Sequence, residues 1–420
     1  MEIYYSFSIL IVIATLFAYL NNRFLKLPST IGIMVITIVF SIGLVIIGQY
    51  TEKPLDDIYQ LINHIDFTQI LMGGMLNFLL FAGAIQINLK DLREQKVPVI
   101  VFSSLSVIIS TFVVGFALYY LLNLVLPHIN LHLEIPLIYC LLFGALISPT
   151  DPVAVLSILK EAKVAKSLET KVAGESLFND GVAVVMFTVL FNISQGIETI
   201  NLSIGSVSWL LAKEVIGGLG VGFLLGLIAW YGIRTANDYK ISVLITLSVV
   251  MGGYLIATAM DISGPLTMVS AGMFIGYERR KNLSSRKIEI KSSVDSFWEL
   301  LDEILNAVLF LFIGFEILLI PELNKYWMTG MICILVVLFA RYISIKIPTL
   351  IIPFREKFSH GTIIILVWGG LRGGVSIALA LSLPQSPYRD VIIAATYFVV
   401  VFSIVVQGLS IGKLAKRIKV

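Results

Sequence analysis

Apolar runs of about 20 residues follow one another along almost the whole chain. A helix of that length crosses the hydrocarbon core of a bilayer, so each run predicts one membrane-spanning helix. The composition agrees, because 58% of the 420 residues are hydrophobic and only 14% are charged. A soluble domain carries roughly 25% charged residues. The sequence therefore predicts an all-α, polytopic membrane protein.

We expect about thirteen membrane-spanning helices joined by short connections. Their expected ranges are 3–22, 28–49, 68–87, 97–126, 135–159, 171–193, 207–232, 240–259, 263–277, 296–319, 326–351, 361–383 and 391–412. The connections leave no room for a soluble domain. Cys140 and Cys333 both fall inside apolar runs, where they indicate small apolar side chains rather than a disulfide or metal framework, and we expect no bound cofactor.

The basic residues predict the orientation of the chain. With the N-terminus outside, 23 of the 30 lysines and arginines fall in cytoplasmic loops or in the cytoplasmic C-terminal tail. This asymmetry is the one that the positive-inside rule describes. We therefore interpret the basic loops as orientation signals and not as a nucleic-acid surface.

Two of the expected helices are interrupted near their middle. Range 135–159 contains Pro149-Thr150-Asp151-Pro152, and range 361–383 contains Gly369-Gly370-Leu371-Arg372-Gly373-Gly374. Proline removes a helical N–H donor, and paired glycines weaken a helix. Thirteen helices can form two inverted six-helix repeats joined by one extra helix, which makes these two helices equivalent. Broken helices at matching positions indicate the binding site of a transporter.

Three carboxylates lie in apolar runs, where a charge costs ~2.5–3.5 kcal/mol. Asp151, Glu175 and Asp180 are the three that belong to the stretches 150–152 and 175–181. On a helix, Ser176 and Asp180 share one face, and Glu175 shares a neighbouring face with Asn179. Asp180 with the Ser176 hydroxyl makes an oxygen-rich face suited to a monovalent cation.

Arg372, in the second break, needs an acidic partner if it is buried, and we predict a structural ion pair between Glu175 and Arg372. Asp180 is then the acid without a fixed partner. Burial disfavours its charged form, which suits the exchange of a proton for a cation. The alternative is that Asp180 only forms hydrogen bonds between helices. Arg341 also needs an acid, which the sequence does not identify.

Two residues of the first break keep alternatives open. Asp151 precedes Pro152 and could cap the half-helix that begins there, or it could contribute charge or oxygen to an ion. Thr150 could offer its hydroxyl or its carbonyl group to that ion.

A further acidic group opens range 296–319. Ser296 and Glu299 fit a capping box at a helix N-terminus, a position that also favours the following Asp302 and Glu303. We favour this structural interpretation over an acidic vestibule that attracts cations.

Three segments resemble motifs of the monovalent cation/proton antiporter family of the NhaP and NHE type. They are Ser148-Pro149-Thr150-Asp151-Pro152-Val153-Ala154-Val155, Gly174-Glu175-Ser176-Leu177-Phe178-Asn179-Asp180-Gly181 and Gly369-Gly370-Leu371-Arg372-Gly373. Weaker similarities are Ser263-Gly264-Pro265-Leu266, Phe297-Trp298 and Val406-Gln407-Gly408-Leu409. Together they extend in family order from about residue 70 to the C-terminus.

The resemblance implies a homodimer that exchanges Na⁺ or Li⁺ for H⁺ by alternating access. It implies a dimerisation domain, here 1–95 and 205–320, and a moving core domain, here 96–204 and 321–420. At the ion site it implies Asp180, Ser176 and Thr150 as cation ligands, Asn179 as a neutral neighbour and Glu175–Arg372 as a stabilising pair. An Asn-Asp pair also implies electroneutral, one-for-one exchange.

The chain departs from the family pattern in one place. Many relatives carry a glutamate in the third helix, where this chain has Ala82. A full set of carboxylate ligands is therefore not expected, and water or Asn77 could take the place of the missing acid.

Other functions fit the sequence less well. K⁺/H⁺ exchange would use the same site, since ion choice depends on cavity size. A passive cation channel needs no titratable acid. An intramembrane aspartyl protease would use Asp151 and Asp180 as a dyad, but the Gly-x-Gly-Asp segment of such enzymes is absent. We therefore expect a transporter and not an enzyme.

Overall fold

The computed structural model describes residues 2–48, 67–125, 134–162, 164–195, 204–236, 238–281, 285–318, 320, 325–354 and 358–418. Within these ranges the regular secondary structure is entirely helical. The α-helices are α1 (Glu2–Leu20), α2 (Ser29–Gly48), α4 (Phe67–Ile70), α5 (Leu76–Gln86), α6 (Leu89–Glu94), α7 (Lys96–Ile100), α8 (Ser106–Tyr120), α9 (Leu137–Ile147), α10 (Val153–Glu161), α11 (Lys166–Ser194), α12 (Ile204–Ala236), α13 (Tyr239–Ala259), α14 (Gly264–Lys281), α15 (Ser285–Glu316), α16 (Trp327–Ile351), α17 (His360–Trp368), α18 (Gly374–Leu381), α19 (Arg389–Phe402) and α20 (Gly408–Ile418).

Short π-helical segments continue several of these helices without ending them. They are Asn21–Leu25, Leu71–Met75, Val101–Leu105, Leu121–Val125 and Ser403–Gln407. Every one of the thirteen expected ranges contains helix, and the all-α class is confirmed. Among the described residues, eight stretches are long and apolar enough to cross a membrane, and Leu71–Gln86 and Leu137–Ile147 are shorter apolar helices. The number of crossings, thirteen, stays a prediction.

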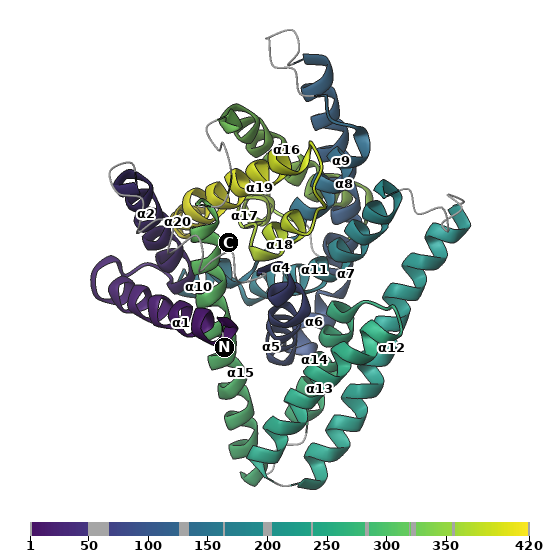
Figure 1. The fold of residues 1–420 in the computed structure, drawn as a ribbon. Helices are drawn as coiled ribbons and strands as arrows, with labels where there is room; N and C mark the ends of the chain where they lie inside the picture. Colours follow the sequence, from purple (N-terminus) through teal and green to yellow (C-terminus); the bar gives the residue numbers. More distant parts are fainter. Residues whose placement is uncertain are drawn as a thin grey trace.

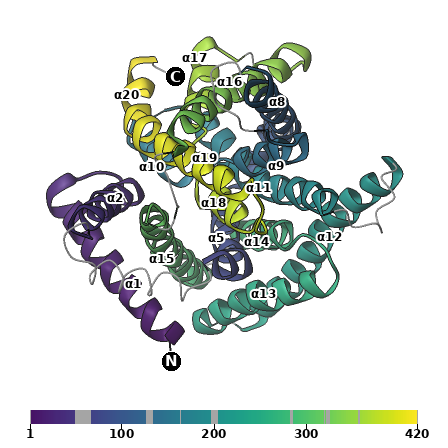
Figure 2. The ribbon, with the colours of Figure 1, turned by 45° about the horizontal axis from the view of Figure 1, so that its top comes forward.

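In Figure 2 the broken helices α9–α10 and α17–α18 lie with α11, α16 and α19 in one group in the upper part of the view. Other helices lie below this group on two sides. Helices α12, α13 and α14 pack together on one side, in teal to green in Figure 1. Helices α1 and α2 lie on the other side, and α15 packs against α1, α2, α5 and α13.

Aromatic packing fixes the part of α15 that faces the centre. The Trp298 side chain is completely buried, and its ring centroid lies 4.6 Å from that of Phe81 on α5. Its indole N–H donates to the Thr246 hydroxyl on α13 at 3.0 Å. A buried tryptophan whose N–H is satisfied holds its helix in one rotation. The residues of α15 one turn after Trp298 are therefore set against α5 and the broken helices.

Both interruptions lie where proline and glycine predict them. Helix α9 ends at Ile147 and α10 begins at Val153, while α17 ends at Trp368 and α18 begins at Gly374. Each break leaves backbone groups without helical partners, and they need other partners because both breaks are buried. The site is built from these groups.

Candidate functional site

The two breaks supply hydrogen-bond partners to each other. The backbone N–H of Asp151 donates to the carbonyl oxygen of Leu371 at 2.8 Å. In the other direction, the Arg372 guanidinium donates to the carbonyl oxygens of Ser148 at 2.8 Å and Pro149 at 3.0 Å. Charge-assisted bonds of this kind are stronger than neutral ones. The breaks are thus joined to each other at the centre of the protein.

The last helix completes the partners of the second break. The Ser403 hydroxyl accepts from the backbone N–H of Arg372 at 2.9 Å, and the Gln407 amide donates to the carbonyl oxygen of Trp368 at 3.0 Å. Both residues lie in the π-helical segment Ser403–Gln407. The sequence points to this region only through its weak Val406–Leu409 similarity, which gives no role to Ser403.

Glu175 pairs with a different arginine from the one predicted. Its carboxylate lies 2.5 Å from the Arg341 guanidinium of α16, and both side chains are almost fully buried. Arg341 also donates to the carbonyl oxygen of Leu366 at 3.0 Å. The predicted Glu175–Arg372 pair is wrong because Arg372 donates to the carbonyl oxygens that the first break leaves open. Gly370 leaves space for Arg341, since a Cβ atom there would lie 2.7 Å from its Nε.

Asn179 holds the first break and is fully buried. Its amide nitrogen donates to the Thr150 hydroxyl at 2.8 Å, and its amide oxygen accepts from the Thr150 backbone N–H at 3.4 Å. The Thr150 hydroxyl lies 3.0 Å from that of Ser176. Asn179 therefore fixes the orientation of Thr150, and the two hydroxyl groups form a pair on the wall of a cavity.

Asp151 has the hydrogen bond that its capping interpretation requires. Its Oδ1 accepts from the Val153 backbone N–H at the start of α10, at 2.9 Å. The same side chain lines the cavity, so its role toward an ion stays a prediction. Gly373 of the second break gives it room, because a Cβ atom there would lie 2.5 Å from Asp151 Oδ2.

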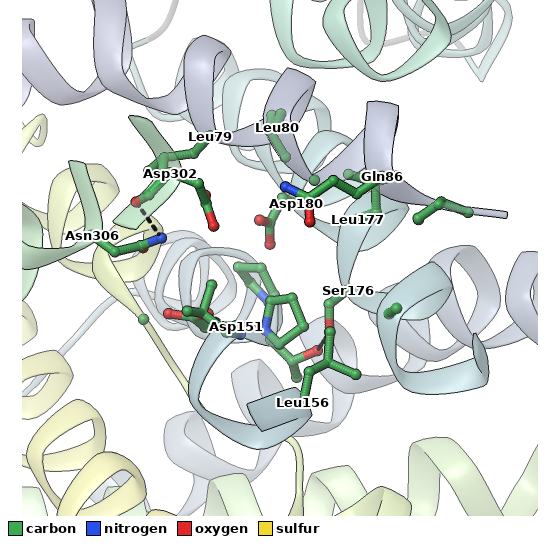
Figure 3. Close-up of a pocket in the computed structure, with 18 of the residues that line it drawn as sticks. Leu79, Leu80, Gln86, Asp151, Leu156, Ser176, Leu177, Asp180, Asp302 and Asn306 are labelled. Atoms are coloured by element: carbon green, nitrogen blue, oxygen red, sulfur yellow. Dashed lines mark hydrogen bonds between the residues drawn. The ribbon is translucent and has the colours of Figure 1, made fainter. Parts of the chain in front are cut away.

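A cavity of about 510 Å³ lies beside the two breaks (Figure 3). Its walls come from α5, both breaks, α11 and α15, and its polar lining includes Gln86, Asn88, Asp91, Thr150, Asp151, Ser157, Lys160, Lys166, Glu169, Thr170, Ser176, Asp180, Asp302, Asn306 and Ser376. Lys160 and Lys166 are exposed, so that end of the cavity reaches the surface that the charge pattern assigns to the cytoplasm. Lys166 forms an ion pair with Asp91 at 2.9 Å.

The Asp180 carboxylate projects into this cavity (Figure 3). The residue is 9% exposed. Within the described part of the chain it forms no hydrogen bond or ion pair, which distinguishes it from Asp151 and Glu175. A buried carboxylate without a partner is costly unless it is protonated or binds a cation. The structure therefore brings Asp180, Ser176, Thr150 and Asp151 to one cavity, and places Asn179, Glu175 and Arg372 behind it.

The sequence favours helix capping over a cation-attracting vestibule for the acids at the start of range 296–319, but the structure places one of them in the cavity wall. Asp302 and Asn306 line the cavity, and the Asn306 amide donates to the Asp302 carbonyl oxygen at 2.9 Å. The capping box predicted for Ser296 and Glu299 is wrong, because α15 begins at Ser285 and these residues lie in its interior. The spacing of Asp302 four residues after Trp298 is the sequence feature that could have shown its direction.

The position at which many relatives carry a glutamate in the third helix is occupied by Ala82. Ala82 is buried in the packing of α5 and does not line the cavity. Asn77 does not line it either: a Cβ atom on Gly264 of α14 would lie 3.3 Å from its amide oxygen. The idea that Asn77 fills in for a missing acid is not supported.

Two discontinuous helices that meet at an oxygen-lined cavity inside a membrane define a secondary transporter. The family model described as "Sodium/hydrogen exchanger, transmembrane" matches residues 11–417, so the chain belongs to that family. It is a multi-pass integral membrane transporter and not an enzyme.

Curated relatives agree with this assignment. The chain is 44% identical over 414 residues to the Na⁺/H⁺ antiporter NhaP of Pseudomonas aeruginosa, which covers 97% of this chain and 95% of the relative. It is 33% identical over 401 residues to the Na⁺/H⁺ antiporter NhaH of Halobacillus dabanensis, covering 94% and 93%. Its fold is similar to that of the sodium proton antiporter MjNhaP1 of Methanocaldococcus jannaschii, with a TM-score of 0.76 at 21% identity over 99% of both chains.

Proposed function

We propose that this protein exchanges Na⁺, or Li⁺, for H⁺ across the membrane, with cation and proton competing for Asp180. The curated relatives described above are Na⁺/H⁺ antiporters by name, which favours sodium over the K⁺/H⁺ alternative. The observation that carries the proposal is the Asp180 carboxylate, which is buried, faces the cavity and has no protein partner in the described ranges.

The surroundings of Asp180 suit one exchangeable charge. The Ser176 and Thr150 hydroxyl groups offer neutral oxygen ligands, and Asn179 keeps Thr150 in place. Glu175 is neutralised by Arg341 and so does not need a second cation. One carboxylate can hold either one proton or one monovalent cation, so we expect electroneutral one-for-one exchange. Asp151 adds negative charge near the ion while it caps α10.

Alternating access requires one domain to move against another, and the chain divides into two such domains. We assign 96–204 and 321–420 to a moving core domain, and 1–95 and 205–320 to a dimerisation domain in a homodimer. The core ranges contain both breaks, α11 and α16, which are tied together by the Glu175–Arg341 pair and the bonds of Arg372. The cavity has core residues on one wall and α5 and α15 on the other. We place the protein in a bacterial plasma (inner) membrane with the N-terminus outside.

Substitution of Asp180 tests the proposal. Asp180→Asn in proteoliposomes with an enclosed pH dye should abolish proton flux driven by Na⁺, Li⁺ or K⁺. Asp261→Asn removes an acid whose side chain is 88% exposed and serves as the matched control. Size-exclusion chromatography checks that both variants remain folded. Cation-driven proton flux in folded Asp180→Asn would refute the assignment, and the three cations rank the substrates.

A further inference from the structure

Helix α15 contributes an acidic side chain to the cavity from the wall opposite the two breaks. Figure 3 shows the Asp302 carboxylate pointing into the same space as the carboxylate of Asp180, with Asp151 below them. Asn306, one turn further along α15, lines the same wall, and its amide is bound to the Asp302 backbone. The α5 wall adds Leu79, Leu80, Gly83 and Gln86, so it brings no acid of its own.

The charges around Asp302 favour a cation. Asp302, Asp180 and Asp151 all line this cavity, so their negative charges repel one another when all three are ionised. Arg372 is not part of the cavity lining, and its side chain donates to the carbonyl oxygens of Ser148 and Pro149 instead. A cation placed between the carboxylates lowers the energy of all three.

A second polar group on the opposite wall has no partner. Ser376 of α18 is 1% exposed and lines the cavity, and its hydroxyl finds no hydrogen-bond partner in the structure. A buried hydroxyl usually has such a partner, so an exception calls for an explanation such as a water or an ion. With Asp180, this makes two buried polar side chains that line the cavity and have no hydrogen-bond partner in the described ranges.

We propose that Asp302 forms an entry site for the transported monovalent cation on the α15 wall, from which the cation passes to Asp180. This inference rests on the proposed function and adds a second binding position to it. The cation gives up part of its water at Asp302 and Asn306 before it reaches the hydroxyl groups at the break. Asp302 therefore raises the affinity for the cation without taking part in the exchange at Asp180.

The position of Asp302 makes its effect one-sided. Asp302 lies in the range assigned to the dimerisation domain, past which the core moves, whereas Asp180 lies in the moving core. When the core carries the cation to the other face, Asp302 stays behind. It therefore helps only in the state in which this cavity is open, and cation affinity from the opposite face does not depend on it.

The test compares Na⁺ dependence in proteoliposomes with the protein in known orientation. We expect Asp302→Asn and Asp302→Ser to raise the KM for Na⁺ on the cytoplasmic face by about fivefold to tenfold. Each variant removes one negative charge near the cation, in surroundings of intermediate dielectric constant. The maximal rate and the KM for Na⁺ on the opposite face should change by less than about twofold. Asp302→Glu, which keeps the charge, should restore most of the affinity.

Glu303→Gln is the matched control, because it removes the neighbouring acid of α15, which is exposed and outside the cavity lining. An equal rise of KM in Glu303→Gln would reduce the effect to general surface charge and overturn the entry site. An unchanged KM in both neutral Asp302 variants would overturn it as well. A loss of maximal rate and thermal stability that Asp302→Glu does not restore would assign Asp302 a structural role. Wild-type exchange and its loss in Asp180→Asn decide the proposed function separately.

Discussion

Glu175 and Arg341 form a buried ion pair with 2.5 Å between carboxylate and guanidinium, and the two side chains are only 2% and 6% exposed. The pair joins α11, which carries Asp180, to α16. Arg341 extends the connection to the carbonyl oxygen of Leu366, one turn before the second break. Helix α11 is thus linked through Arg341 of α16 to α17.

Removing one member of this pair should cost more than removing both. Glu175→Gln leaves the buried Arg341 charge without its partner, and such losses cost about 3–5 kcal/mol. Glu175→Gln combined with Arg341→Gln removes both charges and should recover a large part of that loss. Thermal unfolding in detergent, measured as a double-mutant cycle, checks the coupling. Additive effects of the two substitutions would contradict a direct pair.

Gly373 should not tolerate even alanine. Its backbone conformation is open to any residue, with φ of −123°, so the constraint is space and not strain. A Cβ atom there would lie 2.5 Å from Asp151 Oδ2 and would push the two breaks apart. Overpacking of this kind costs about 1–3 kcal/mol. We expect Gly373→Ala to lower exchange activity and stability together. Gly252→Ala of α13, where no atom lies within 4 Å, is the control that should keep its activity and should not lose stability.

The Thr150 hydroxyl should matter both to cation affinity and to the shape of the break. Thr150→Val keeps the volume but removes the acceptor for Asn179 and the neighbour of Ser176. An unsatisfied buried donor costs about 1–3 kcal/mol. We expect a raised KM for Na⁺ and a lower unfolding temperature, while Thr150→Ser, which retains the hydroxyl, stays near wild type. Wild-type affinity in Thr150→Val would exclude the hydroxyl as a ligand.

The sequence predicts the helices and their interruptions well because those signals are local. An apolar run of membrane length, two prolines around Asp151 and glycine pairs around Arg372 act on the residues that carry them. The motif similarity predicts the correct family for a related reason, since its segments lie at the breaks and on α11. The helices and their interruptions can therefore be predicted without knowing which helices are in contact.

The partners of the buried charges depend on three-dimensional packing instead. Arg341 and Arg372 both lie in apolar runs, and either could neutralise Glu175 by chemistry alone. The choice is made by the carbonyl oxygens of Ser148 and Pro149, which take Arg372 and leave Arg341 for Glu175. The position of Asp302 in the cavity wall also depends on packing. The sequence favours capping there, because the polar start of α15 hides the fact that its helix begins at Ser285.

Exchange at a single carboxylate predicts insensitivity to membrane potential. If Asp180 carries either one proton or one Na⁺, each cycle moves no net charge. An imposed potential of either sign should therefore leave the initial rate of Na⁺-driven proton flux unchanged in proteoliposomes. A rate that follows the potential would show that a further charge moves, and Asp151 and Asp302 would be the first candidates because both line the cavity.

Competition for Asp180 also predicts how pH changes the apparent Na⁺ affinity. When the pH on the Na⁺ side falls through the range in which Asp180 titrates, protons occupy the carboxylate that Na⁺ must bind. The apparent KM for Na⁺ should then rise by up to about tenfold for each pH unit, while saturating Na⁺ restores the maximal rate. The measurement is Na⁺ titration at several pH values with the opposite face held at constant pH. Asp302→Asn should shift the whole KM curve upward without changing its slope, because Asp302 holds the cation only before it reaches Asp180. A fall in maximal rate at constant KM would contradict competition and would instead indicate a separate proton site.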